Sequence, residues 1–281
     1  MNETKKYELT SETLQYAGHT LHRIKALKDF GSVKAGELGG WVEKEENLSQ
    51  YGNAWVSDDA WVSDDARVSG DARVCGDARV SGDARVCGDA RVCDNARVCG
   101  DARVCGDARV SGDARVCGDA RVCGDARVCD NAWVCDNAWV SDNARVCDNA
   151  WVCDNARVSD NARVYDNTRV YDNARVSGNA WVCDNARVSG DARVCGDARV
   201  CGDARVCGNA DYIVFKNFWS SGRYFTWTRS NNKWCVGCFY GTGEELIKKA
   251  YSDSEISGRE YERVVRYVEG ILADEKKETS N

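Results

Sequence analysis

The dominant pattern along the chain is a six-residue repeat of small apolar and polar positions. Valine occupies every sixth position from Val56 to Val206, which makes 26 repeats, and alanine lies two positions before each valine except at Thr168. Arg or Trp separates the two, and Ser, Cys or Tyr follows the valine. A polar pair drawn from Gly, Asp and Asn completes each unit. A fixed period of this kind determines the fold, so it is interpreted first.

Each unit reads as a short β-strand followed by a corner. Side chains alternate along a strand, so Ala and Val share one face while Arg and Cys share the other. Arginine fills most of the positions between Ala and Val, so the Ala/Val face is predicted to be buried. Gly, Asp and Asn tolerate the positive φ of a sharp corner. Three corners close a triangle, and one coil takes about 18 residues.

Stacked coils of this kind form an elongated rod. Neighbouring coils pair as parallel strands about 4.8 Å apart, so the repeats predict between eight and nine coils and a rod roughly 40 Å long. The narrow interior explains why alanine and valine fill it. Leu, Ile and Phe are scarce, so a conventional globular core is not expected.

The repeats resemble those of a known family. Val-Cys-Asp-Asn-Ala and Val-Ser-Gly-Asp-Ala look like the hexapeptide repeat of left-handed parallel β-helices, in which a small residue lies four places after an aliphatic one. The resemblance covers more than half of the chain and implies left-handed coils, an exception to the usual right-handed crossover. One departure is the Ser, Cys or Tyr after each valine, where the family prefers Gly or a small or acidic residue.

The predicted fold class is an all-β solenoid. It is a left-handed parallel β-helix of triangular coils, with a β-rich N-terminal cap and a small α+β C-terminal module. Caps are expected because bare terminal strands invite end-to-end association. The predicted segments are an N-terminal hairpin cap and irregular first coil (1–53), the hexapeptide-repeat β-helix (54–210), a C-terminal α+β capping module (211–273) and a disordered tail (274–281).

Within the caps, the sequence predicts individual elements. A hairpin from Thr13 to Leu27 turns near His19. The C-terminal module alternates like strands and then takes a helical period, with strands expected at 212–218, 223–229 and 234–239 and helices at 244–251 and 259–273.

Both caps carry further resemblances. The segment DFGSVKAGELGGWVEKEENLSQYGNAWV (29–56) resembles the opening segment of hexapeptide-repeat proteins of the YdcK type, which are labelled as transferases by inference from their fold. Similar segments occur in phage and prophage proteins. The piece WCVGCFYGTGEELIKKAYSDS (234–254) resembles a small C-terminal module in phage-encoded proteins of unknown function. These resemblances imply a phage-related origin.

Composition and charge exclude several classes of function. The formal net charge is −7, and arginines and aspartates nearly balance along the repeats, so no net positive stripe exists for nucleic acid. No run of apolar residues is long enough to span a membrane, and the polar start does not resemble a signal peptide. The 17 cysteines exchange freely with serine between repeats, which favours a reducing cytoplasm over a disulfide scaffold.

The family resemblance implies acyl transfer from acyl-CoA. Hexapeptide acyltransferases generally use a histidine base, often near a loop that interrupts the helix, with the site between subunits. The repeats contain neither histidine nor an inserted loop, and His19 and His22 lie in the N-terminal cap. A general base must reach its substrate. The sequence therefore disfavours catalysis and predicts no catalytic residue and no cofactor.

Two arrangements of cysteine suggest a metal or redox site. Cys235 and Cys238 form a C-x-x-C motif, but a zinc ribbon needs a second pair, and a redox motif begins a helix, whereas this one falls in a predicted strand. Rod cysteines form outward columns that suit a thiophilic metal, yet serine occurs in the columns, so no metal site is predicted. Two such columns are Cys87, Cys105 and Cys123, and Cys99, Cys117, Cys135 and Cys153.

The repeat is least uniform between residues 129 and 187. There the corner becomes Asp-Asn and aromatic residues replace arginines. Large outward aromatics amid arginines are typical binding anchors, although stacking of the rings on one another is the simpler alternative. Trp55 and Trp61 are expected to pack under the N-terminal cap. The predicted partner-binding residues are Trp133, Trp151 and Tyr171 on one face, Tyr165 and Trp181 on another, and Trp139 on the third.

The sequence thus predicts a non-enzymatic structural or interaction scaffold. A rigid rod would present its faces and caps to a protein partner that the sequence does not identify. Two alternatives stay open: a hexapeptide-repeat acyltransferase that uses acyl-CoA, and an element that polymerises end to end.

Overall fold

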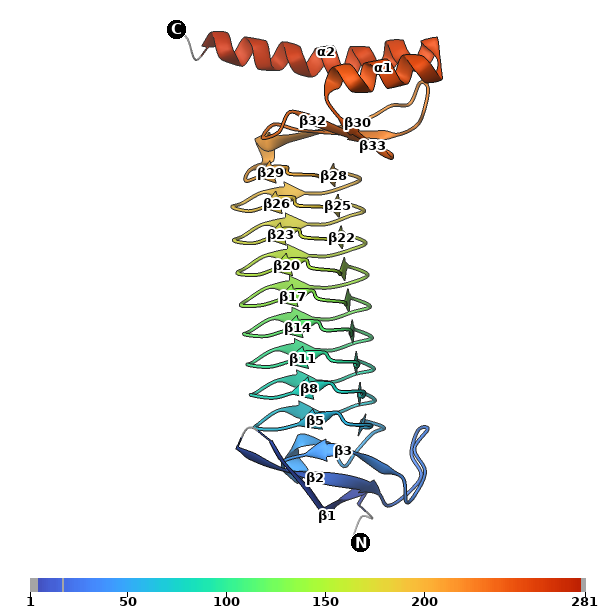
Figure 1. Cartoon of the computed structure of the whole chain (residues 1–281), viewed down its shortest axis with the longest axis vertical. Coiled ribbons are helices and arrows are strands. Elements are labelled where there is room, and N and C mark those ends of the chain that lie inside the picture. The colour runs from blue at the N-terminus through green and yellow to red at the C-terminus, as the bar shows by residue number, and fades with distance from the viewer. Residues whose placement is uncertain (1–4, 17, 279–281) are drawn as a thin grey trace.

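Twenty-six two-residue strands stack into a β-solenoid in the computed structural model, which describes residues 5–16 and 18–278 (Figure 1). Each strand is the Arg-Val or Trp-Val pair of one repeat, from β4 (Trp55–Val56) to β29 (Arg205–Val206), and successive strands start six residues apart. A strand pairs in parallel with the strand three units further on, as Val92 pairs with Val110. The predicted solenoid with three strands per coil is confirmed.

Three parallel sheets make the three faces of the rod. Face A holds every third strand from β5 (Trp61–Val62) to β29 and belongs to a 12-stranded sheet. Face B is the 9-stranded sheet from β4 to β28 (Arg199–Val200). Face C is the 8-stranded sheet from β6 (Arg67–Val68) to β27 (Arg193–Val194). These sheet sizes agree with the predicted eight to nine coils.

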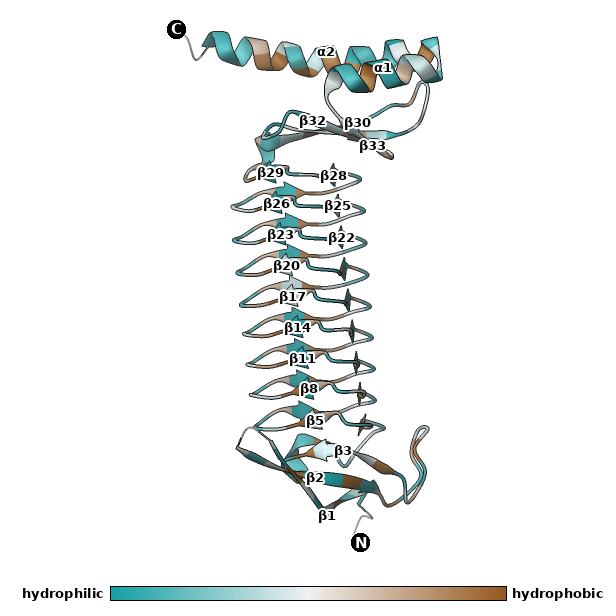
Figure 2. Cartoon of the chain, viewed as in Figure 1, coloured by the Kyte–Doolittle hydropathy of each residue, from teal (hydrophilic) through white to brown (hydrophobic). Residues whose placement is uncertain are grey.

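The interior of the rod is built from alanine and valine. Every alanine and valine of the repeats from Ala54 to Val206 is buried. Thr168, the exception to the alanine rule, is buried too, and its hydroxyl donates to the Tyr165 carbonyl at 2.6 Å. Figure 2 shows hydrophilic and hydrophobic residues alternating within each coil. A β-strand period thus gives each coil one inward apolar face.

The corners take the positive φ that their residue types predict. Gly88 has φ 72° and Asp136 has φ 56°. Coils stack closely here, since a Cβ added to Gly88 would lie 2.9 Å from the Gly106 nitrogen. Aspartate at this position gains a compensating bond: the Gly112 amide donates to Asp94 Oδ2 at 3.1 Å, one coil further on.

A three-stranded cap closes the N-terminal end. Strands β1 (Tyr7–Tyr16) and β2 (His19–Ala26) form an antiparallel hairpin, and β2 pairs with β3 (Leu38–Val42). Strand β3 then pairs in parallel with β5 and so extends face A. The hairpin begins at Tyr7, earlier than the predicted Thr13.

The early start of the hairpin has a physical cause. The Tyr7 side chain is buried, and its hydroxyl donates to the Leu48 carbonyl at 2.7 Å, just after the 3₁₀ turn η1 (Glu45–Asn47). The predicted packing of Trp55 under the cap is confirmed, because its ring lies 6.4 Å from that of Tyr7. Trp61 lies 5.2 Å from the Tyr16 ring.

A small α+β module closes the other end, as predicted. Turn η2 (Asn209–Asp211) leads into an antiparallel sheet, and two helices lie over that sheet (Figure 1). Within the described part of the chain, no helix is long and apolar enough to cross a membrane. The strands are β30 (Tyr212–Lys216), β31 (Tyr224–Thr228), β32 (Lys233–Val236) and β33 (Phe239–Gly241), and the helices are α1 (Gly243–Asp253) and α2 (Glu255–Glu278).

The prediction of a disordered tail is wrong for residues 274–278, which continue α2. Arg229 holds this part of the helix, because its guanidinium donates to both carboxylate oxygens of Glu275 at 2.9 Å. Lys277 adds an ion pair with Asp274 at 2.9 Å. Residues 279–281 of the predicted tail lie outside the described residues.

Side chains of the caps satisfy the backbone groups of the terminal coils. In the last coil, the Arg199 amide donates to Thr226 Oγ1 at 2.8 Å, and the Arg205 amide donates to Ser230 Oγ at 2.7 Å. In the first coil, Asn47 Nδ2 donates to the Ala66 carbonyl at 2.9 Å. These are groups that a further coil would otherwise engage.

Candidate functional site

Six outward aromatic residues form what we call the aromatic belt: Trp133, Trp139, Trp151, Tyr165, Tyr171 and Trp181. The structure places them on the faces that the sequence predicts. On face A, β17 (Trp133–Val134) pairs with β20 (Trp151–Val152), and the two indole rings lie 4.9 Å apart, edge to face. Tyr171 follows β23 (Arg169–Val170), the next strand of that face.

The other two faces carry the rest of the belt. On face B, Tyr165 and Trp181 lie on successive coils with ring centroids 6.5 Å apart. On face C, Trp139 lies in β18 (Trp139–Val140). The belt therefore surrounds the rod rather than marking a single face.

Arginines of neighbouring coils cover the faces of the tryptophan rings. The guanidinium carbons of Arg163 and Arg199 both lie 4.9 Å from the Trp181 ring, one on each neighbouring coil. On face A, Arg115 lies 5.4 Å from the Trp133 ring. The rings thus pack on one another and on arginines, so packing within the rod, the simpler alternative, accounts for part of the arrangement. Trp139 and Trp151 still expose 37% and 39% of their surface, which leaves their edges accessible to a partner.

Beside the belt, the corner carboxylate moves from the second corner position to the first. Where the corner is Asp-Asn, asparagines stack along the rod, and Asn161 Nδ2 donates to Asn179 Oδ1 at 3.3 Å. The remaining aspartates accept backbone hydrogen bonds, as Asp160 Oδ2 does from the Gly178 amide at 2.9 Å. Each Asp-Asn corner keeps one carboxylate, and four tryptophans take positions that arginine fills in most other repeats. The belt therefore has fewer arginines than the flanking coils and nearly as many carboxylates.

Shallow grooves run along the more charged coils towards the N-terminal end. One groove of about 420 Å³ lies on face A, and Trp133 forms its end nearest the belt. A second groove of about 540 Å³ lies on face C. Both grooves are lined by the arginine column on one side and by the corner Asp or Asn column on the other.

The histidines of the N-terminal cap are the candidates for a general base. His19 Nδ1 lies 3.0 Å from Glu43 Oε1, and His19 Nε2 lies 3.6 Å from Asp64 Oδ1. The hydrogen bond to Glu43 raises the pKa of His19 above its ordinary value. Both ring nitrogens therefore face carboxylates, and the protonated form is favoured, which suits an ion pair better than proton abstraction. His22 lies opposite Val42 in the hairpin sheet.

The C-x-x-C motif does not act as a pair. Cys235 lies in β32 and is buried, whereas Cys238 lies in the turn before β33 and is exposed. The expectation that the whole motif lies inside a strand is therefore wrong, because Gly237 takes φ 61° and turns the chain between the two cysteines.

Three groups of described side chains bring potential metal ligands within 4.8 Å of one another. Two of them combine two thiols of successive coils with the aspartate that follows the first thiol. The groups are Cys129, Asp130 and Cys147; Cys183, Asp184 and Cys201; and His19, Glu43 and Asp64.

Two exposed aromatics were not predicted as site residues. Phe218 and Trp219 expose 73% and 82% of their surface in the segment between β30 and β31. The sequence assigned Phe218 to a strand, whereas β30 ends at Lys216. The neighbouring aromatic pair just before Ser220-Ser221-Gly222 is the signal that could have identified them.

The comparison with known families concerns the rod. The family model described as "YdcK Beta solenoid repeat" matches ten segments of the chain, all between residues 60 and 196. The matched coils are similar to YdcK-type solenoid repeats. The matched segments are 60–76, 66–82, 72–88, 84–100, 90–106, 102–118, 120–136, 156–170, 168–184 and 182–196.

A curated relative carries the same name as these YdcK-type repeats. The "Uncharacterized acetyltransferase YdcK" of Escherichia coli K12 is 47% identical over 38 residues, which cover 14% of this chain and 12% of the relative. The chain thus matches only a small part of that relative's length.

Two solved structures similar to this chain are named as acyltransferases, and both share little sequence identity with it. The UDP-N-acetylglucosamine acyltransferase of Francisella novicida is 10% identical, with a TM-score of 0.48, over 54% of this chain and 62% of that chain. An acetyltransferase candidate from Bacillus cereus is 11% identical, with a TM-score of 0.30, over 67% of this chain and 92% of that chain. Neither likeness carries a conclusion about function.

Proposed function

We propose that this protein is a rigid binding rod that recognises a protein partner through the aromatic belt. The observation that carries the proposal is the joint change in residues 129–187, where four tryptophans replace arginines and the corner carboxylate moves to the first corner position, which leaves stacked asparagines at the second. Tryptophan is enriched among the residues that dominate binding energy, and arginine-flanked rings are pre-ordered by their stacking. A partner would contact the exposed edges of Trp139 and Trp151.

The caps at both ends of the rod argue against the alternative of end-to-end polymerisation. Thr226 and Ser230 accept the amides of the last coil, and Asn47 donates to a carbonyl of the first coil. Stacking a second rod would require these bonds to break. The capped geometry therefore favours recognition along the sides of the rod over polymerisation through its ends.

A substitution that restores the repeat tests the belt. Trp133→Arg with Trp151→Arg places at both positions the residue that most repeats carry, so the coils are expected to stay folded. Immobilised protein should then capture its partner from host lysate at least about tenfold less well than wild type, since two anchor residues are lost. Arg85→Ala with Arg103→Ala on face C is the matched control. Equal capture by wild type and the tryptophan variant would overturn the proposal.

Acyl transfer is the second candidate, and the names of the relatives favour it over the scaffold. The Escherichia coli relative is named an acetyltransferase, and the repeat model that matches the rod carries the same YdcK name. In this chain the base would be His19, which Glu43 orients at 3.0 Å. Both ring nitrogens of His19 face carboxylates and its pKa is raised, which argues against its use as a base. Acetyl-CoA hydrolysis or transfer that His19→Gln abolishes would favour this candidate.

A reducing compartment, such as the cytoplasm, is part of the proposal. All 17 cysteines carry free thiols, and most of them take an outward position that serine fills in other repeats. Thiols at positions of this kind persist where glutathione or thioredoxin keeps them reduced.

A further inference from the structure

A group of two cysteines and an aspartate lies where the rod joins the C-terminal module, and a third cysteine contacts it. Cys183 follows β25 (Trp181–Val182) and Cys201 follows β28, so the two thiols lie on successive coils of face B. Cys235 of β32 approaches from the module, and its Sγ lies 3.1 Å from Sγ of Cys201. Two parts of the chain with separate hydrophobic cores thus place sulfur atoms side by side.

The two central sulfurs are shielded from water. Cys201 and Cys235 expose 8% and 7% of their surface, whereas most outward cysteines of the rod are partly exposed. The Arg199 guanidinium donates to the Gly237 carbonyl at 2.8 Å and holds the turn after β32 against the coil. This contact places a positive charge next to the sulfurs, where it offsets the charge of thiolates.

Asp184 supplies an oxygen to the same cluster. Its carboxylate lies within 4.8 Å of the thiols of Cys183 and Cys201. Its Oδ2 accepts from the Gly202 amide at 3.0 Å, which fixes the side chain towards the next coil. A carboxylate has lone pairs on both oxygens, so it can keep this bond and also bind a cation.

We propose that Cys183, Cys201, Cys235 and Asp184 form a zinc site that fastens the C-terminal module to the rod. Structural zinc takes four tetrahedral ligands, chiefly Cys thiolates, with His or Asp completing the set. Zn–S bonds of about 2.3 Å set the sulfurs of such a site about 3.8 Å apart. The sulfurs of Cys201 and Cys235 lie 3.1 Å apart. Cys183, Asp184 and Cys201 already lie within 4.8 Å of one another, so the Cys235 side chain would have to turn towards this group to complete the set.

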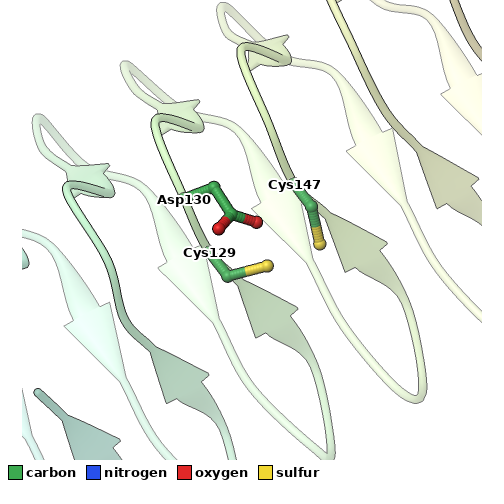
Figure 3. Close-up of side chains that lie close together, drawn as sticks. All are labelled: Cys129, Asp130 and Cys147. Carbon is green, nitrogen blue, oxygen red and sulfur yellow. The ribbon is translucent and has the colours of Figure 1, made fainter.

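The rod contains an internal comparison for this site. Cys129, Asp130 and Cys147 repeat the arrangement three coils earlier on face B, and Figure 3 shows the two thiols on successive coils with the carboxylate beside them. There the next outward position is Tyr165 rather than a third cysteine. That group offers two thiols, so it should bind zinc more weakly than the junction.

A titration of the full-length reduced protein tests the proposal. We expect one equivalent of zinc to stay bound in the presence of a competing chelator. Cadmium in place of zinc should give a thiolate-to-metal charge-transfer band. Cys235→Ser should lower the affinity of that equivalent at least about tenfold. Cys238→Ser is the matched control, because Cys238 lies three residues away but is exposed. Asp184→Asn should also weaken zinc, which gives a second variant that leaves every thiol in place.

Zinc should also protect the junction. In hydrogen exchange, the amides of β28 and β32 should become more protected on adding zinc to wild type, and not in Cys235→Ser. Equal zinc affinity in wild type and Cys235→Ser would overturn the proposal. So would a Cys201–Cys235 disulfide in place of metal in the untreated protein. A third contrary result is copper(I) binding that is tighter than zinc binding and is unchanged in Asp184→Asn.

Discussion

At the scale of single residues, the corner decides how closely coils stack. The sequence predicted positive φ at the corners, because Gly and Asp tolerate it, and both take it. The repeats show that Gly at the first corner position is usually followed by Asp, and Asp by Asn, but they do not show why. The structure gives a reason. Aspartate at the first position accepts a hydrogen bond from a backbone amide of the next coil, and asparagine at the second position donates to the asparagine of the next coil.

A corner substitution separates conformation from hydrogen bonding. Asp94 has φ 61°, and most L-residues pay about 1–2 kcal/mol for such a conformation, whereas glycine does not. Asp94→Ala should therefore be less stable than Asp94→Gly by about 1 kcal/mol, although both lose the bond from the Gly112 amide. Urea unfolding followed by circular dichroism measures the difference. Equal midpoints for the two variants would contradict this account of the corners.

At the scale of elements, the caps are where sequence reasoning was least complete. The hairpin start at Tyr7 and the helical residues 274–278 both depend on partners far along the chain, Leu48 and Arg229. A local period does not reveal such partners. Three strands and both helices of the C-terminal module were predicted because their alternation and helical period are local, whereas the turn at Gly237 and the separate strand β33 were missed.

The bond between Thr226 and the last coil gives a prediction for the C-terminal cap. Thr226→Val removes the acceptor of the Arg199 amide, so that amide should exchange with deuterium several-fold faster, at a cost of about 1 kcal/mol. Thr228→Val is the control, because Thr228 donates to Asn231 within the module. Equal protection of Arg199 in both variants would show that the module does not cap the coil in this way.

His19 predicts a pH dependence for the N-terminal cap. Its hydrogen bond to Glu43 raises its pKa above 6.5, so the stabilisation is fully present below that pH and is lost as pH rises through the raised value. Wild type should therefore exceed His19→Gln in melting temperature at pH 6 more than at pH 8. A difference that is constant with pH would contradict the ion pair.

At the scale of the whole molecule, the repeat specifies the rod but not its use. Inward Ala and Val, outward Arg, and corners of Gly, Asp and Asn together predicted the solenoid and its three sheets. The faces of the belt residues followed from the same spacing. The arginine stacking on Trp181 and the contact of Cys235 with Cys201 did not, because side-chain packing and a non-periodic segment decide them.

The most direct test of the binding proposal is a site-specific photo-crosslink. A photoreactive phenylalanine analogue at Trp151, within the belt, is compared with the same analogue at Arg97, three coils earlier on face A. The account predicts a crosslinked partner from position 151 and none from position 97 when each protein is irradiated in host lysate. Equal crosslinking at both positions, or crosslinking from position 97 alone, would contradict recognition through the aromatic belt.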